Sequence, residues 1–161
     1  MKTNLLVFLL LCLFILPSCN DDNRVPDFVS TATLTVFEDK YPLAKDVEWK
    51  MLDNYVVVDF EQNQVDMEAW FDNNGVWYMT EIDVPFILIP DVIQGSFSQS
   101  QYATWRVDDV DMIERNTLDT VYVLEVEQGN KELDLYYSLN GILIDVKTGN
   151  RDKGYMDLLP V

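Results

Sequence analysis

The chain has 161 residues, of which 28 are acidic and 11 basic, so its formal net charge is −17; it has two cysteines and no histidine. An acidic surface repels phosphates, which argues against nucleic acid as a partner and against adsorption on anionic lipid headgroups. The composition also excludes histidine-dependent catalysis.

The first residues are typical of an export signal. Lys2 precedes the apolar run Leu5–Leu16, and the tetrapeptide LPSC ends at Cys19. The run is too short for a membrane-spanning helix, which needs ~20 apolar residues, so we expect residues 1–18 to be a signal peptide. The tetrapeptide resembles the lipobox of bacterial lipoproteins, which predicts lipidation at Cys19. An ordinary cleaved signal with an incidental cysteine, or acylation at Cys12, is the alternative.

Residues 19–28 are expected to form an acidic tether. The stretch NDDN that begins at Asn20 resembles the surface-export signal of bacterial lipoproteins. We therefore expect an exported outer-membrane lipoprotein, on the cell surface or facing the periplasm, that contacts the bilayer through acylated Cys19. After cleavage one cysteine remains, so no internal disulfide is possible and stability must come from a packed core.

An internal repeat organises the rest of the chain. Tyr55–Val76 aligns without a gap with Val121–Ile142, sixty-six residues later, and both end in Asn-Gly followed by an aliphatic residue. We assign residues 29–84 to a first repeat and residues 85–148 to a second, with residues 149–161 as a C-terminal tail.

Each repeat is predicted to begin with a helix. Val29–Lys40 is compatible with a strand or with a helix capped by Ser30 and ended by Pro42. The corresponding Pro90–Ala103 favours a helix, because Pro90 suits a first helical position and Ile93 and Phe97 share a face. We therefore expect two helices.

Four strands follow each helix in the prediction. Asn-Gly at residues 74–75 and 140–141 lies between alternating runs and suits a tight hairpin with positive φ values. The fold class is thus α+β, a tandem repeat of a helix and a four-stranded antiparallel meander. The predicted strands are 47–52, 55–62, 64–72, 76–82, 107–113, 121–128, 131–138 and 142–147.

Alternation divides the side chains between two faces. One face, which we expect the helices to cover, holds apolar residues such as Val56, Val58 and Leu124. The other face is polar, acidic and studded with aromatic rings: Asp59, Glu61, Glu68, Trp70, Asp72, Glu125, Glu127, Asp134, Tyr136 and Ser138.

Several motifs are specific in their order: Phe37-x3-Tyr41-Pro42, Val47-Glu48-Trp49, Tyr55-Val56-Val57 and the FDNNGVW stretch at residues 71–77. Over about residues 28–148 they resemble the PepSY-like family of exported bacterial proteins. The resemblance implies the fold of the β-lactamase inhibitor protein, in which tandem helix-plus-sheet units join into one curved sheet. The motifs are turn and core residues, so the resemblance transfers no catalytic or binding residue.

Other chemistry has weak support in the sequence. A carboxylate pair such as Glu68 with Asp59 could serve glycoside hydrolysis, but acids on a solvated face are usually surface residues. The DNNG stretch lacks the ligand order of an EF-hand and is explained by a turn. We therefore expect no enzyme activity, no cofactor and no metal site.

The acidic aromatic face is the candidate binding site. Trp70 and Tyr136 are equivalent in the repeat, and Glu68 and Asp134 lie beside them. Exposed aromatic rings anchor protein interfaces, and rings with carboxylates also suit sugars; packing of these rings between the two repeats is the structural alternative. We expect a non-catalytic, inhibitor-like envelope protein that binds a protein partner on a curved sheet face, or alternatively a carbohydrate-binding surface lipoprotein.

Overall fold

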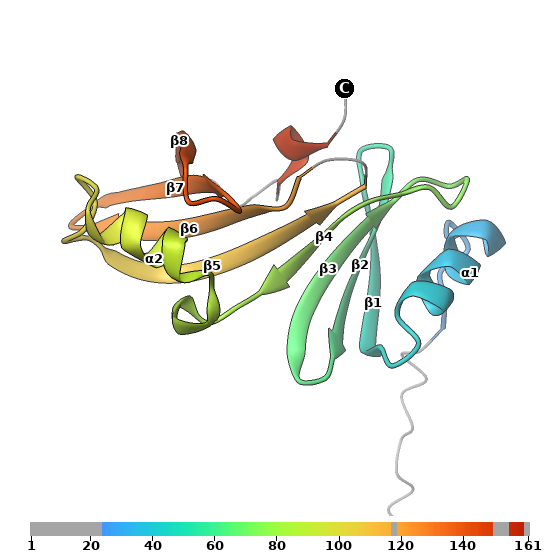
Figure 1. Ribbon diagram of the computed structural model, residues 1–161. Coiled ribbons are helices and arrows are strands. Elements are labelled where there is room, and N and C mark those ends of the chain that lie inside the picture. The colour runs from blue at the N-terminus through green and yellow to red at the C-terminus, as the bar shows by residue number, and fades with distance from the viewer. Residues whose placement is uncertain (1–23, 117–118, 150–154, 160–161) are drawn as a thin grey trace, which may run out of the picture.

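The computed structural model describes residues 24–116, 119–149 and 155–159 as a mixed α+β fold. Eight antiparallel strands form one sheet in the order β1 to β8, and the two α-helices lie at opposite ends of it (Figure 1). The predicted signal peptide and Cys19 lie outside the described residues. The elements are α1 (Thr31–Lys40), β1 (Lys45–Leu52), β2 (Tyr55–Gln62), β3 (Val65–Phe71), β4 (Trp77–Asp83), η1 (Phe86–Leu88), α2 (Asp91–Ser98), β5 (Arg106–Arg115), β6 (Val121–Gln128), β7 (Lys131–Ser138), β8 (Leu143–Thr148) and η3 (Met156–Leu158).

The ambiguous first segment is a helix because its cap and its core residues agree. The Ser30 side chain accepts a hydrogen bond from the Thr33 amide at 3.0 Å, which satisfies a free amide of the first turn. The Thr33 hydroxyl donates to the Asp72 carbonyl at 2.8 Å, and Phe37 is buried. The helix ends at Lys40, before Pro42, as predicted.

The second helix is shorter than the predicted segment Pro90–Ala103. It spans Asp91–Ser98, and Pro90 is its N-cap rather than its first helical residue. Ile93 and Phe97 are buried, as their spacing predicts. The linker before it is partly buried: Ile89 is buried, and Ile87 and Leu88 of η1 are exposed.

The two Asn-Gly turns differ from the tight hairpin that the sequence favours. Only the glycine has positive φ, +83° at Gly75 and +75° at Gly141. The Gly75 amide donates to the Asp72 carbonyl at 3.1 Å, and the Asp72 amide donates to the Val76 carbonyl at 3.0 Å. This is a turn followed by a left-handed glycine, the next most common hairpin connection. Consecutive positive φ values occur instead at Asn63 and Gln64, between β2 and β3.

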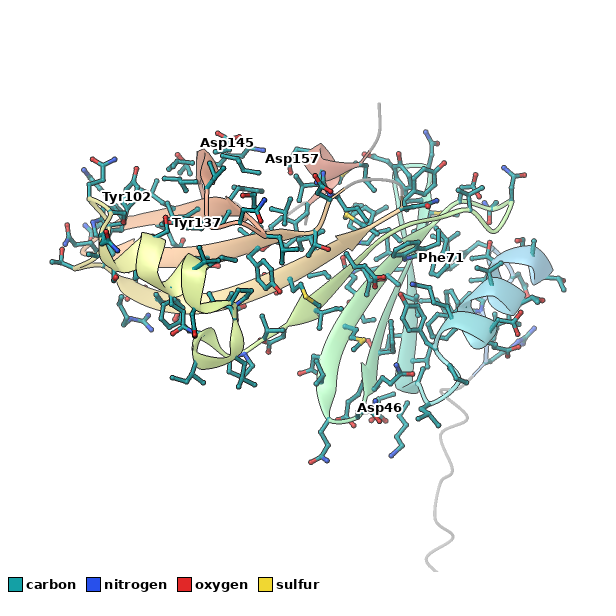
Figure 2. The ribbon with its side chains drawn as sticks, viewed as in Figure 1. Asp46, Phe71, Tyr102, Tyr137, Asp145 and Asp157 are labelled. Atoms are coloured by element: carbon teal, nitrogen blue, oxygen red, sulfur yellow. The ribbon has the colours of Figure 1, made fainter. Side chains whose placement is uncertain are left out.

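Each helix covers an apolar part of one sheet face, as predicted. Phe37 of α1 contacts the ring of Phe60 with centroids 5.2 Å apart and shares a buried cluster with Val56, Val58 and Phe71. Figure 2 shows Phe71 on the side of the sheet next to α1. Ile93 and Phe97 of α2 pack in the same way in a second cluster, whose buried sheet residues are Val110, Tyr122, Leu124, Val126, Leu135 and Tyr137.

The centre of the sheet is buried on its other face as well. A third cluster there contains Trp70, which is 0% exposed, and Tyr136, which is 3% exposed. Of the two interpretations that the sequence left open, packing of these rings in the interior is therefore the one that the structure shows, and exposed rings are excluded. The central strands β4 and β5 contribute Met79 and Ile113 to this cluster. The cluster therefore extends across the middle of the sheet, from Trp70 on β3 to Tyr136 on β7.

Candidate functional site

We call the sheet face opposite α1 and α2 the open face, and its strand register gathers acidic side chains there. Asp59 of β2 pairs with Glu68 of β3, which pairs with Glu81 of β4. Asp83 of β4 pairs with Asp111 of β5. Directly paired residues in an antiparallel sheet project to the same face with Cβ atoms about 5 Å apart. The acids of four strands thus form one continuous surface.

This surface is hollowed into an acidic groove of about 370 Å³. Its lining residues extend from Asp46, at the start of β1, to Asp83 of β4 and Asp111 of β5. Phe60 and Met67 line it too, and its other nine lining residues are all carboxylates: Asp46, Asp59, Glu61, Asp66, Glu68, Glu81, Asp83, Asp109 and Asp111.

A single lysine bridges two acids of the groove. The Nζ of Lys50 lies 3.1 Å from Asp59 and 2.5 Å from Glu68. The other oxygen of Glu68 accepts a hydrogen bond from the Trp70 indole at 2.7 Å. The pair Asp59 and Glu68, a possible glycosidase pair in the sequence, is therefore held by structural contacts.

Burial shifts the protonation of two of the predicted site residues. It raises the pKa of Glu68, and neighbouring Asp59 adds to this shift while Lys50 opposes it. It also raises the pKa of Asp134, with a further contribution from Glu132 against the opposing Lys147. Both carboxyl groups take up protons more readily than exposed acids do.

An apolar band crosses the open face beside the groove. Register places its members on β2 to β7, and Trp70 and Tyr136 both belong to it. Thus the structure brings the four predicted site residues to one face, but the two rings lie in the band and Asp134 is 8% exposed. The band consists of Val57, Trp70, Met79, Ile113, Val121, Val123 and Tyr136.

The C-terminal segment, residues Tyr155–Leu159, covers this band. Leu159 is 8% exposed and belongs to the same cluster as Trp70, while Tyr155 meets the Tyr136 ring edge-on with centroids 6.3 Å apart. The Tyr155 hydroxyl donates to Asp111 at 2.5 Å. Lys147 contacts both Asp145 and Asp157, which lie on the same side of the sheet in Figure 2.

Within the described ranges, one group of acids is close enough to share a metal ion, and it lies outside the groove. It consists of Asp108, Glu127 and Glu132. The guanidinium of Arg106 already bonds two of them, Asp108 at 2.6 Å and Glu127 at 2.7 Å. Ion pairs with Arg106 therefore account for two of the three acids.

Comparison with family models gives a match over residues 53–145, more than half of the chain, to the family described as β-lactamase-inhibitor-like and PepSY-like. The chain belongs to this PepSY-like family. A comparison with curated proteins finds no match.

Solved structures support the same assignment. The PepSY-like chain is 35% identical to a protein described as BLIP-like from Bacteroides fragilis, with a TM-score of 0.71 over 82% of this chain and 94% of that one. It is 29% identical to a DUF2874 family protein from Bacteroides ovatus, with a TM-score of 0.72 over 76% and 89% of the two chains. A DUF2874 family protein from Bacteroides uniformis, 23% identical, has the same fold with a TM-score of 0.71 over 78% and 90%.

Several groove residues of this PepSY-like protein escaped the sequence interpretation. Glu81 and Asp83 alternate on β4, and Asp109 and Asp111 alternate on β5, so each pair shows on one face of its own strand. Their meeting depends on the register between β4 and β5, which the sequence does not specify. No helix among the described residues has the length and apolar character to cross a bilayer.

Proposed function

We propose that this protein is a non-catalytic, lipid-anchored envelope protein that binds a protein partner on the open face of its sheet, in an inhibitor-like manner. Membership in the PepSY-like, β-lactamase-inhibitor-like family supports protein binding. The observation that carries the proposal is the acidic groove, in which nine carboxylates line one hollow.

The groove specifies the charge of the partner. Of the eleven lining residues none is basic, and Lys50 beside them neutralises only part of the charge of Asp59 and Glu68. A patch of one sign attracts and orients a partner of the opposite sign. The partner surface should therefore present lysine or arginine side chains to Glu68 and its neighbours.

The same contacts support a binding role over catalysis. Glu68 is committed to Trp70 and Lys50, and Tyr155 donates to Asp111. The glycan alternative relied on exposed rings at positions 70 and 136. Because both rings are buried, they offer no stacking platform in this structure.

The lipid anchor is the second part of the proposal. Acylation of Cys19 would hold the described fold at the outer membrane through a short tether that ends at α1, on the cell surface or facing the periplasm. Metabolic labelling with an alkynyl fatty acid should mark the wild type and leave Cys19→Ala unmarked. Equal labelling of both, or of neither, would contradict lipidation at this residue.

Capture from envelope extracts tests the groove. Asp66 and Asp83 line it and are exposed, so the double variant Asp66→Asn/Asp83→Asn removes two charges with little effect on packing. The matched control Glu38→Gln/Asp39→Asn removes two exposed charges from α1. We expect the groove variant to lose the partner at moderate salt and the control to retain it. Equal capture by both variants would show that the groove is not the binding surface.

A further inference from the structure

The C-terminal segment is attached to the sheet differently from every strand. Within the described ranges, its backbone hydrogen bonds are internal: the Leu158 amide donates to the Tyr155 carbonyl at 2.9 Å, and the Leu159 amide donates to the Met156 carbonyl at 3.2 Å. Its contacts with the sheet are made by side chains. A peptide that binds as a helix in a groove is held in the same way, by side-chain anchors.

Two kinds of contact hold the segment. Leu159, with Leu158 and Met156 beside it, packs in the apolar band. The Tyr155 hydroxyl reaches the nearly buried carboxylate of Asp111 at 2.5 Å, which fixes the position of the segment. An apolar surface with one oriented polar contact is the usual composition of a specific binding site.

Asp111 connects this surface with the acidic groove. It lines the groove and also accepts the hydrogen bond from Tyr155. A partner that lies in the groove therefore meets Tyr155, the first residue of the C-terminal segment. The band and the groove are adjacent parts of one face, and the segment occupies one of them.

We propose that Tyr155–Leu159 is an internal ligand of the apolar band, and that a partner segment of the same chemistry replaces it: a tyrosine hydroxyl on Asp111 and aliphatic side chains three and four residues further on. This deepens the proposed function and rests on it for the identity of the face. Displacement uncovers Tyr136, which then becomes a binding anchor. The partner thus contributes basic side chains to the groove and an apolar segment to the band.

The covalent link between Tyr155–Leu159 and the rest of the chain makes this segment a strong competitor against a free peptide. A segment linked to its own site by a few residues has an effective concentration of about 1 mM, so a free copy at micromolar concentration rarely replaces it. Weakening the internal copy should open the band to a free copy. The sequence itself supplies the probe, the capped peptide Tyr-Met-Asp-Leu-Leu of residues 155–159.

The test is isothermal titration calorimetry of this peptide with the full chain and with Leu158→Ser/Leu159→Ser. We expect the variant to bind the peptide at least tenfold more tightly than the wild type does. A peptide with phenylalanine in place of Tyr155 should bind the variant about tenfold more weakly, because it cannot donate to Asp111. Leu43→Ser, a matched change at a leucine that is 61% exposed, should behave like the wild type.

Three results would overturn the proposal. One is a folded double variant, verified by circular dichroism, that binds the peptide no better than the wild type. Another is equal binding of the tyrosine and phenylalanine peptides. The third is global unfolding of the double variant, which would make the segment an integral part of the core. The peptide assay contains no envelope partner, so a failed capture experiment would remove the proposed function and leave the internal ligand standing.

Discussion

Replacing Gly141 by alanine tests how closely α2 approaches the β7–β8 turn. Gly141 has φ of +75°, a conformation that costs an L-residue about 1–2 kcal/mol. A Cβ at this position would lie 2.7 Å from the carbonyl oxygen of Val92 in α2, so the start of the helix would have to move. Overpacking of this kind costs about 1–3 kcal/mol more, which gives a total loss of about 2–5 kcal/mol.

Gly129 separates the two contributions. Its φ is +65°, but nothing lies within 4 Å of an added Cβ, so Gly129→Ala should lose only the conformational part. Gly75→Ala should resemble Gly141→Ala, because its Cβ would lie 2.9 Å from the Ala32 carbonyl of α1. The equivalent valine changes should be still more destabilising, since a branched side chain resists positive φ.

The assay is urea unfolding followed by circular dichroism. With a dependence on urea of about 2 kcal/mol per molar, Gly141→Ala should lower the midpoint by about 1–2.5 M and Gly129→Ala by about 0.5–1 M. Equal losses at the two positions would refute the close approach of α2 to the turn. A negligible loss at both would refute the turn conformation itself.

Two further predictions concern the open face. Trp70→Ala should lower the free energy of unfolding by about 3–5 kcal/mol, because it empties a fully buried site; an unchanged urea midpoint would mean that the ring is not in the core. The raised pKa values of Glu68 and Asp134 mean that the folded state binds protons more tightly than the unfolded state, so these groups lower stability as the pH rises above the ordinary values of 4.5 and 3.8. The urea midpoint should therefore rise as the pH falls from neutral toward the ordinary Glu value of 4.5, and this rise should be smaller in Glu68→Gln/Asp134→Asn; an equal rise in both proteins would contradict the effect of burial on these carboxyl groups.

The strands could be predicted from the sequence because local alternation determines them. Six of the predicted strands start and end within one residue of the observed ones, and β2, β6 and β7 match at both ends. The helix at Thr31–Lys40 needed more than local preference, since its β-branched residues also suit a strand. The Ser30 cap and the burial of Phe37 decide it in the structure.

The open face was harder to predict, because alternation separates two faces without showing what covers them. It placed Glu68 and Trp70 on one face correctly, yet the carboxylate is partly accessible and the ring is enclosed. Tyr55 packs against the Trp70 ring, and Tyr155–Leu159 cover the part of the band near Tyr136. The residues of this C-terminal segment are too few to show a periodic pattern and lie in what reads as a tail. The set of acidic residues predicted for the open face was incomplete for a similar reason. Asp111 comes next to Asp83 in the groove only because β4 pairs with β5 in this register.

The β4–β5 pair has a thermodynamic consequence for the repeated sequence. The cluster on the open face draws Val57 and Met79 from the first four strands and Val123 and Tyr136 from the last four. A chain cut after Asp83 would expose Trp70 and leave the edge of β4 unpaired. Similar sequences therefore do not produce two independent folding units: both must be present for either to be stable, and unfolding should be a single cooperative transition.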